Sequence, residues 1–334
     1  MPDPVRTEIE TPGGGLPVIP AADLSSIFSP RATTLPVLRY LVALADHGHF
    51  GRAAAACGVS QPTLSAQIAQ WEKRLGVQAF VRTGSGVRVT PAGACAVAGA
   101  RAVLDDLRRM ESAATGGPAP FFGPVRLGVI PTIGPYALPY LCPAVEQAWP
   151  DLEMPIHEAQ SQVLIDLLEQ ARLDLILLAE LPALVHPLRT IAPLCDEQFF
   201  LAMPPNHHLA EKAAVSRADV SGERLLLLDQ GHCLRDQALE LCQLRDHLPR
   251  AGADYRATSL ETLRHLVALG HGCTVLPALA APPESTDIVL RPLVPPAFRT
   301  LVLAWRIDDT RGAGFRLMSG VMKKALPRGR VKVR

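Results

Sequence analysis

The chain has 334 residues, of which 48% are hydrophobic and 19% charged, and its formal net charge is +1. This length suffices for two or three domains with buried cores, and no run of about 18 apolar residues predicts a membrane-spanning helix. The start lacks the basic region and apolar core of a signal peptide, and seven scattered cysteines do not form a secreted disulfide pattern. We therefore expect a cytoplasmic protein with no membrane partner and mostly free thiols.

Charge is distributed unevenly along the chain. Residues 31–115 carry ten Lys or Arg against five Asp or Glu, whereas residues 1–30 carry one against four. A basic surplus confined to one small segment suggests a polyanionic partner there. A solvated charged face is the alternative interpretation.

Three short helices are predicted after an N-terminal segment, residues 1–33, that is rich in Pro and Gly and is expected to be a mobile tail. The first helix begins at Leu35 and ends before Gly48, and an alanine-rich helix follows it. Ser60 is the predicted N-cap of the third helix, which ends at Gly76. Its apolar positions are expected to face the core: Leu64, Ile68, Trp71 and Leu75.

Two short strands around a Gly-Ser-Gly turn follow the third helix, so residues 34–92 are predicted to form a winged helix-turn-helix domain. The outer face of the third helix carries small or hydroxyl-bearing side chains, which suits a helix lying in the major groove of double-stranded DNA. A helical bundle that binds no nucleic acid is the alternative. The candidate DNA contacts are Arg52, Ser60, Gln61, Pro62, Thr63, Ser65, Arg82 and Arg88.

A long helix is predicted from Pro91 to about Ala114, inside a linker and hinge region at residues 93–120. Apolar or small residues recur along it at spacings of three and four, which is typical of a coiled-coil seam, although Glu111 interrupts the seam. We expect this helix to pair two subunits. Packing of the helix on its own domain remains open.

From residue 121 to 334, short apolar strands alternate with helices, which predicts an α/β domain with a mostly parallel sheet. We expect two lobes, with lobe I at about 124–195 and 300–330 and lobe II at about 196–299. The predicted strands lie at 125–130, 173–179, 198–204, 224–229, 273–277 and 300–305.

Two cysteines, Cys233 and Cys242, flank a segment with strong helix formers. If the interval were helical, the two Cα atoms would lie roughly 13–14 Å apart along the axis, whereas a disulfide needs them within about 6.8 Å. Helix and disulfide therefore exclude each other. The helix N-terminus, with His232 and Arg235 beside it, is expected to lower the pKa of Cys233. Two inert core cysteines are the alternative; no metal-ligand spacing surrounds the pair, and no metal or other cofactor is expected.

The segment FGRAAAACGVSQPTLSAQIAQWEKRLGVQAFVRTGSGVRVTPAG resembles the N-terminal domain of the LysR-type transcriptional regulators, and the resemblance covers Leu35 to about Ala114. Trp71 stands where the family usually has leucine, and the turn of the wing lacks basic residues. The resemblance implies a winged helix-turn-helix joined to a C-terminal two-lobed α/β regulatory domain like the periplasmic binding proteins. The geometry of such a DNA-binding domain implies symmetric dimers on pseudo-palindromic operators.

Further motifs, GVIPTIGPYALPY, GHCLRDQALELC and YRATSLETLRHLVALGHGCTVLPALA, resemble the peroxide-sensing OxyR-type branch of that family, from Leu38 to about Arg306. The resemblance implies that Cys233 reacts with hydrogen peroxide and that Cys242 resolves the product into a disulfide. Arg306 would lie near the reactive sulfur. The residues expected around the peroxide are Thr132, Ser161, His232, Arg235, Asp236 and Arg306.

The sequence thus predicts a peroxide-sensing transcriptional regulator and not an enzyme. By analogy with the family we expect a tetramer built as a dimer of dimers, with RNA polymerase and a thiol reductant as further partners. One rival is a regulator gated by an organic effector between the lobes. Another is a thiol peroxidase that turns over peroxide.

Overall fold

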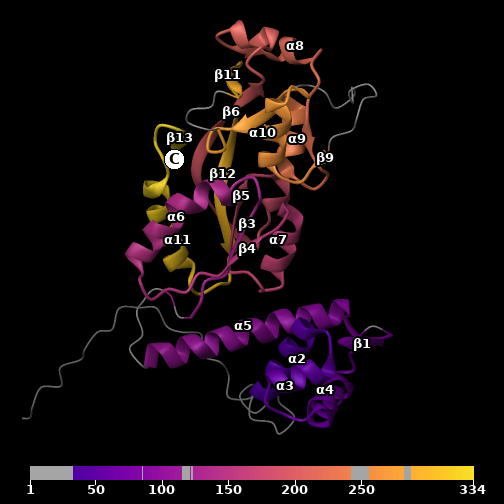
Figure 1. Ribbon diagram of the computed structural model, residues 1–334. Coiled ribbons are helices and arrows are strands. Elements are labelled where there is room, and N and C mark those ends of the chain that lie inside the picture. The colour runs from indigo at the N-terminus through magenta and orange to yellow at the C-terminus, as the bar shows by residue number, and fades with distance from the viewer. Residues whose placement is uncertain (1–32, 85, 115–120, 122, 242–255, 282–286) are drawn as a thin grey trace, which may run out of the picture. The chain divides into compact units, whose positions relative to one another are not determined.

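The computed structural model describes residues 33–84, 86–114, 121, 123–241, 256–281 and 287–334. The chain divides into two compact units after Gly93 (Figure 1). The predicted N-terminal tail lies outside the described residues, except for Thr33. Among the helices of the described ranges, none combines the length and the apolar character needed to cross a membrane.

The N-terminal unit contains three helices and a two-stranded antiparallel wing. The third helix starts where the Ser60 hydroxyl accepts a hydrogen bond from the Thr63 N–H at 3.3 Å, and it ends at Gly76, whose φ of +67° favours glycine. These local signals were predicted from sequence. The elements are α2 (Leu35–His47), α3 (Phe50–Ala56), α4 (Gln61–Leu75), β1 (Phe80–Thr83) and β2 (Gly86–Val89).

The inner face of α4 is formed by three of the four predicted residues. Leu64, Ile68 and Trp71 are buried, whereas Leu75 is 51% exposed, so its assignment to the core was wrong. Leu75 is the last residue of the helix. The final turn therefore extends past the neighbouring helices, although the helical period continues.

Helix α5 (Pro91–Ala114) follows the wing and begins close to it. The Thr90 hydroxyl accepts a hydrogen bond from the Gly93 N–H at 3.0 Å. A Cβ atom at Gly93 would lie only 2.0 Å from the Ala79 carbonyl oxygen. The start of α5 is therefore sterically compatible only with glycine at this position.

The C-terminal unit is built on a sheet of nine strands, whose main path runs β4-β3-β5-β12-β6-β11-β7. The prediction of a mostly parallel sheet was wrong, because the two long strands β6 and β12 pair antiparallel with every neighbour that they have in it. The strands are β3 (Leu127–Val129), β4 (Ile156–Glu158), β5 (Leu175–Ala179), β6 (Arg189–Met203), β7 (Val215–Ser216), β10 (Thr274–Pro277), β11 (Val289–Val294), β12 (Phe298–Arg306) and β13 (Val331–Val333), and a separate parallel pair is formed by β8 (Leu227–Leu228) and β9 (Arg256–Ala257).

Two hydrophobic cores lie along this sheet. In the first lobe, α6 and α11 lie on one side of the strands and α7 on the other (Figure 1). In the second lobe, α10 packs against β6 and β10. The helices are α6 (Gly134–Ala148), α7 (Ser161–Glu169), α8 (Arg217–Val220), α9 (Cys233–Leu241), α10 (Leu260–Ala268) and α11 (Gly312–Ala325), with short 3-10 turns η1 (Pro182–Leu184) and η2 (His208–Glu211).

Strands β6 and β12 carry the chain between the two cores. The two strands pair antiparallel with each other between the cores, with Leu301 opposite Cys195 and Thr300 opposite Asp196. The Thr300 hydroxyl donates a hydrogen bond to Asp196 Oδ1 at 2.8 Å. Residues on these two strands can therefore contact side chains of both lobes at once.

We expect Gly93→Ala to destabilise the N-terminal unit by about 1–3 kcal/mol, because the added methyl group overlaps the backbone of Ala79. Gly99→Ala is the matched control in the same helix: its Cβ meets no atom within 4 Å, so alanine should stabilise the helix by roughly 0.5–1 kcal/mol. Hydrogen exchange of residues 35–93 under mild urea measures both changes. Equal exchange in the two variants would contradict the close approach.

Candidate functional site

Cys233 is the first residue of α9, half-buried, and its side chain packs against the core of the first lobe although α9 belongs to the second. The preceding Gly231 has a φ of +91°, and a Cβ atom there would lie 2.3 Å from Gln160 Oε1. The glycine therefore lets the chain turn into α9 in direct contact with the first lobe.

A small pocket surrounds the Cys233 sulfur and is formed by three chain segments. The turn after β3, the start of α7 and the start of α9 meet there, and the described side chains leave no space for a water-sized sphere. The pocket therefore suits only a small oxidant. The lining residues are Ile130, Pro131, Thr132, Gln160, Ser161, Gly231, His232 and Cys233.

Arg299 connects this pocket to the crossing strands. Its Nη1 and Nη2 donate hydrogen bonds to the Thr132 hydroxyl at 3.1 Å and the Thr132 carbonyl at 3.0 Å. Its Nε donates to Glu197 Oε2 at 2.8 Å, and both side chains of this ion pair are buried. The other Glu197 oxygen accepts the Leu279 N–H at 2.6 Å. The guanidinium is therefore held directly by the turn that contains Thr132 and by Glu197 of β6, and Leu279 in turn holds Glu197.

Burial raises the pKa of the Cys233 thiol above its ordinary value. The Arg299 guanidinium, the Ser161 hydroxyl and the Leu234 N–H at the start of α9 offset part of that rise. The expected net lowering of the Cys233 pKa by the helix N-terminus was therefore wrong, because desolvation outweighs the favourable groups. Burial also lowers the pKa of His232, so its ring is neutral at neutral pH.

Two hydroxyl groups of the first lobe face the sulfur from its pocket. The Thr132 hydroxyl is held by Arg299. The Ser161 Oγ is buried and interacts with the Cys233 sulfur, but it has no nitrogen or oxygen partner within the described part of the chain. It therefore retains hydrogen-bonding capacity for a polar molecule that enters the pocket.

The prediction that Arg306 lies near the reactive sulfur was wrong. Arg306 ends β12, seven residues after Arg299, which corresponds to about 23 Å of extended strand. Its Nη1 donates to the carbonyl oxygens of Leu168 at 2.9 Å and Leu173 at 3.0 Å. These lie at the C-terminal end of α7, whereas Ser161 begins that helix.

Arg235 and Asp236 lie outside the lining of the pocket. Arg235 donates a hydrogen bond to the Leu228 carbonyl at 2.8 Å, and so anchors α9 to the preceding strand. Asp236 is exposed, but its negative charge opposes ionisation of Cys233 and contributes to the raised pKa.

Arg299 is the functional residue that sequence reasoning missed. One available signal was a charged residue beside the apolar run of β12, and another was Glu197 in a second apolar strand. Buried strands rarely carry unpaired charges, so the two residues together would have suggested a buried pair. Nothing local distinguished Arg299 from Arg306.

Helix α9 extends from Cys233 to Leu241, as predicted. Cys242 lies outside the described residues. Of the other cysteines, Cys195 and Cys273 are buried, and burial raises the pKa of each to about 12. Cys95 is exposed.

The predicted DNA-contacting residues gather on α3, the start of α4 and the wing. All are exposed except Ser65, which is half-buried. Arg82 of the wing donates a hydrogen bond to the Ser65 hydroxyl at 3.3 Å and stacks over the Phe50 ring at 4.7 Å. These contacts join the wing to α4 and to the start of α3.

Two family models match the chain. Residues 35–94 match the bacterial regulatory helix-turn-helix of the lysR family, and residues 119–327 match the LysR substrate binding domain. The chain therefore belongs to the LysR family of bacterial transcriptional regulators.

The relatives narrow this assignment. The regulator OxyR of Escherichia coli K12 is 45% identical over 279 residues, covering 80% of this chain and 88% of the relative. A probable hydrogen peroxide-inducible genes activator of Streptomyces viridosporus is 39% identical, covering 89% and 95%. Within the LysR family, the chain belongs to the OxyR group.

Solved structures agree with this placement. A full-length OxyR variant of Pseudomonas aeruginosa is 38% identical, with a TM-score of 0.75 over 87% of this chain and 95% of that one. An H2O2-bound OxyR mutant of Corynebacterium glutamicum is 33% identical, with a TM-score of 0.57 over 88% and 94%.

We expect Arg299→Gln to raise the pKa of Cys233 further, because the thiolate loses its nearest favourable charge. The pH profile of Cys233 alkylation should move to higher pH, and the rate near neutral pH should fall about three- to tenfold, which corresponds to roughly half to one pKa unit. Mass spectrometry of the Cys233 peptide measures this rate. Arg306→Gln is the control and should leave the profile in place; equal effects would contradict the role of Arg299.

Proposed function

We propose that this protein is a DNA-binding transcriptional regulator that senses hydrogen peroxide through Cys233. The observation that carries the proposal is the position of Cys233 in a closed pocket beside two hydroxyl groups and a buried guanidinium. Membership of the OxyR group supports the same conclusion. The small pocket argues against a large organic effector at this position.

In the proposed reaction the Cys233 thiolate attacks one peroxide oxygen and the O–O bond breaks. Cys233 becomes a sulfenic acid, and the other oxygen leaves as hydroxide, which takes up a proton. Thr132 and Ser161 hold the peroxide by hydrogen bonds, and Arg299 favours both the thiolate and the leaving oxygen. The Cys242 thiolate then attacks the Cys233 sulfur, which forms the S–S bond, breaks the S–O bond and releases hydroxide, and the hydroxide takes up a proton to give water.

Disulfide formation requires α9 to unfold. A continuous helix of nine residues places the two ends roughly 12–14 Å apart, whereas disulfide-bonded Cα atoms lie within about 6.8 Å. The covalent bond therefore drives a switch between two arrangements of residues 233–242. We propose that this change repacks subunit contacts and respaces the DNA-binding helices.

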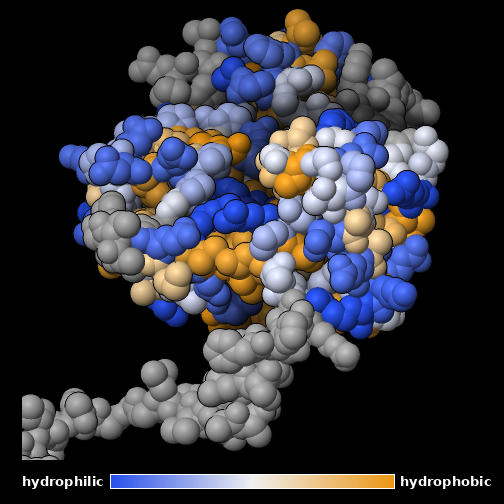
Figure 2. All heavy atoms as spheres, turned by 90° about the horizontal axis from the view of Figure 1, so that it is seen from below, coloured by the Kyte–Doolittle hydropathy of each residue, from blue (hydrophilic) through white to orange (hydrophobic). Residues whose placement is uncertain are grey.

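Self-association is part of this proposal. Val103 and Met110 on α5 are 46% and 62% exposed, and Figure 2 shows hydrophobic side chains at the surface in bands between hydrophilic ones. Val97, Ala100 and Leu104 of the same helix are buried within the chain, so the exposed Val103 and Met110 are the candidate contacts to a second copy. By analogy with the family we propose a dimer of dimers in the cytoplasm, which acts on RNA polymerase and is reset by a thiol reductant without turning over peroxide as an enzyme.

One equivalent of peroxide should cross-link Cys233 to Cys242, and amide hydrogens of residues 234–241 should then exchange faster, because the helix has unfolded. Mass spectrometry of the peptides measures both effects. Cys233→Ser should abolish them, Cys242→Ser should leave sulfenic acid at Cys233, and Cys95→Ser should behave as wild type. A cross-link with unchanged exchange would contradict the switch, and unmodified thiols would favour the effector-gated rival.

Arg52→Ala should weaken binding to all DNA sequences alike and lower the salt dependence of log K by about one, because one phosphate contact is lost. Gln61→Ala should instead relax the preference among bases, since Gln61 lies at the N-terminal end of the recognition helix. Fluorescence anisotropy on an operator selected from random DNA, at several salt concentrations, separates the two effects. Lys73→Ala, near the other end of α4, is the control. If Lys73→Ala and Arg52→Ala have the same effect, the proposed interface is incorrect.

A further inference from the structure

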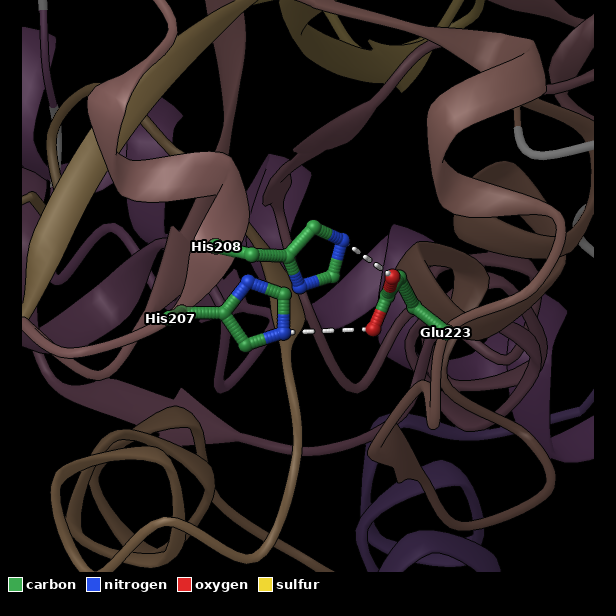
Figure 3. A group of neighbouring side chains, drawn as sticks. All are labelled: His207, His208 and Glu223. Carbon is green, nitrogen blue, oxygen red and sulfur yellow. Dashed lines mark hydrogen bonds and ion pairs between the residues drawn. The ribbon is translucent and has the colours of Figure 1, made fainter.

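A second cluster of reactive side chains lies in the second lobe and takes no part in the thiol pocket. His207, His208 and Glu223 converge so that one nitrogen of each ring faces the carboxylate (Figure 3). His207 Nε2 lies 3.1 Å from Glu223 Oε2, and His208 Nε2 lies 3.2 Å from Glu223 Oε1. All three donor atoms lie within 4.8 Å of one another.

The fold holds this cluster at a junction of three segments. His207 precedes η2 and His208 is its first residue, and the His207 Nδ1 accepts the Leu209 N–H at 3.3 Å. Glu223 follows α8, and its N–H donates to the Val220 carbonyl at 3.0 Å. The Cys273 N–H donates a hydrogen bond to the Arg224 carbonyl at 2.9 Å, and this bond fixes the segment just after Glu223.

The donors are accessible from one side only. The side chains of His207 and Glu223 are 16% and 17% exposed, whereas that of His208 is 68% exposed. Two donors are therefore held by packing, while the third forms an open rim. Such a site admits an ion from solvent without unfolding the lobe.

Two imidazoles and one carboxylate form the donor set that proteins use for borderline divalent transition metals. Ligands about 2.0–2.2 Å from a tetrahedral ion lie roughly 3.3–3.5 Å from one another. The spacings of 3.1 and 3.2 Å run to different oxygens of the Glu223 carboxylate, and the three donor atoms, one from each residue, lie within 4.8 Å of one another, so the ligands must move closer together around an ion. The two spacings also fit two N–H donors on one carboxylate, so they do not by themselves distinguish an ion site from an ion pair.

We propose that His207, His208 and Glu223 bind one divalent ion of the zinc class, with water at the remaining position. The ion binds Nε2 of each ring in place of a proton, and each neutral ring then carries its single proton on Nδ1. At His207, where Nδ1 now accepts the Leu209 N–H, the proton must move from Nε2 to Nδ1, and this weak contact is lost on ligation.

Cys273 lies beside the proposed ion site. Its Sγ is 3.5 Å from His207 Nε2, and it is buried. Among the three proposed ligands, the Glu223 carboxylate supplies the negative charge.

The test uses the full-length reduced protein with Cys233→Ser and Cys242→Ser, so that the redox thiols contribute no ligands. Co²⁺ should bind at one equivalent per chain with visible d–d absorption, Zn²⁺ should displace it, and Zn²⁺ should raise the melting temperature. His208→Ala and Glu223→Gln should each weaken binding at least about tenfold, or roughly 1.4 kcal/mol. Because the His208 side chain is exposed, the first of these variants should leave the fold intact.

His265→Ala is the matched control, because His265 is an exposed histidine on α10 of the same lobe. It should bind Co²⁺ as the parent does. If His208→Ala and Glu223→Gln bind as tightly as the control, the ion sits elsewhere and the proposal fails. If neither Co²⁺ nor Zn²⁺ binds at micromolar concentrations, the three residues form only a hydrogen-bonded ion pair, which also overturns it.

Discussion

The buried ion pair between Arg299 and Glu197 holds the two crossing strands, the first-lobe turn and the thiol pocket in one geometry. Removing one partner of such a pair leaves a buried charge uncompensated and costs about 3–5 kcal/mol. Arg299 also donates a hydrogen bond to the Thr132 carbonyl, and Glu197 also accepts one from the Leu279 N–H. The shape of the thiol pocket therefore depends on a contact between strands, and not on the helix that carries Cys233.

Cys233 combines two opposed demands. Burial favours the protonated resting thiol, whereas Arg299 and Ser161 favour the thiolate that attacks peroxide. The balance leaves the pKa raised, so reactivity depends on groups that act when the peroxide and the developing charge are present. This arrangement limits reaction with bulky oxidants and keeps the helical form of α9 intact until the covalent bond forms.

The histidine cluster and the thiol pocket are connected along the chain through one strand, β8. Glu223 precedes β8 and Cys233 follows it, while the Cys273 backbone is hydrogen-bonded across the same junction through the Leu226 N–H at 2.7 Å. A ligand at the histidine cluster would therefore brace the segment that leads into α9. The other end of α9 is held by no such cluster among the described residues.

The sequence by itself determined the local elements and the family. Helical periodicity and the N-cap Ser60 predicted α4, apolar runs predicted the main strands, and the spacing of Cys233 and Cys242 made helix and disulfide exclusive. It did not determine the strand directions, the exposure of Leu75, the choice of Arg299 over Arg306, or the raised pKa of Cys233. These depend on contacts between distant segments: Thr132 and Arg299 are 167 residues apart. Local patterns reflect backbone preferences of neighbouring residues, whereas burial, desolvation and ion pairing arise only when the sheet brings remote strands together.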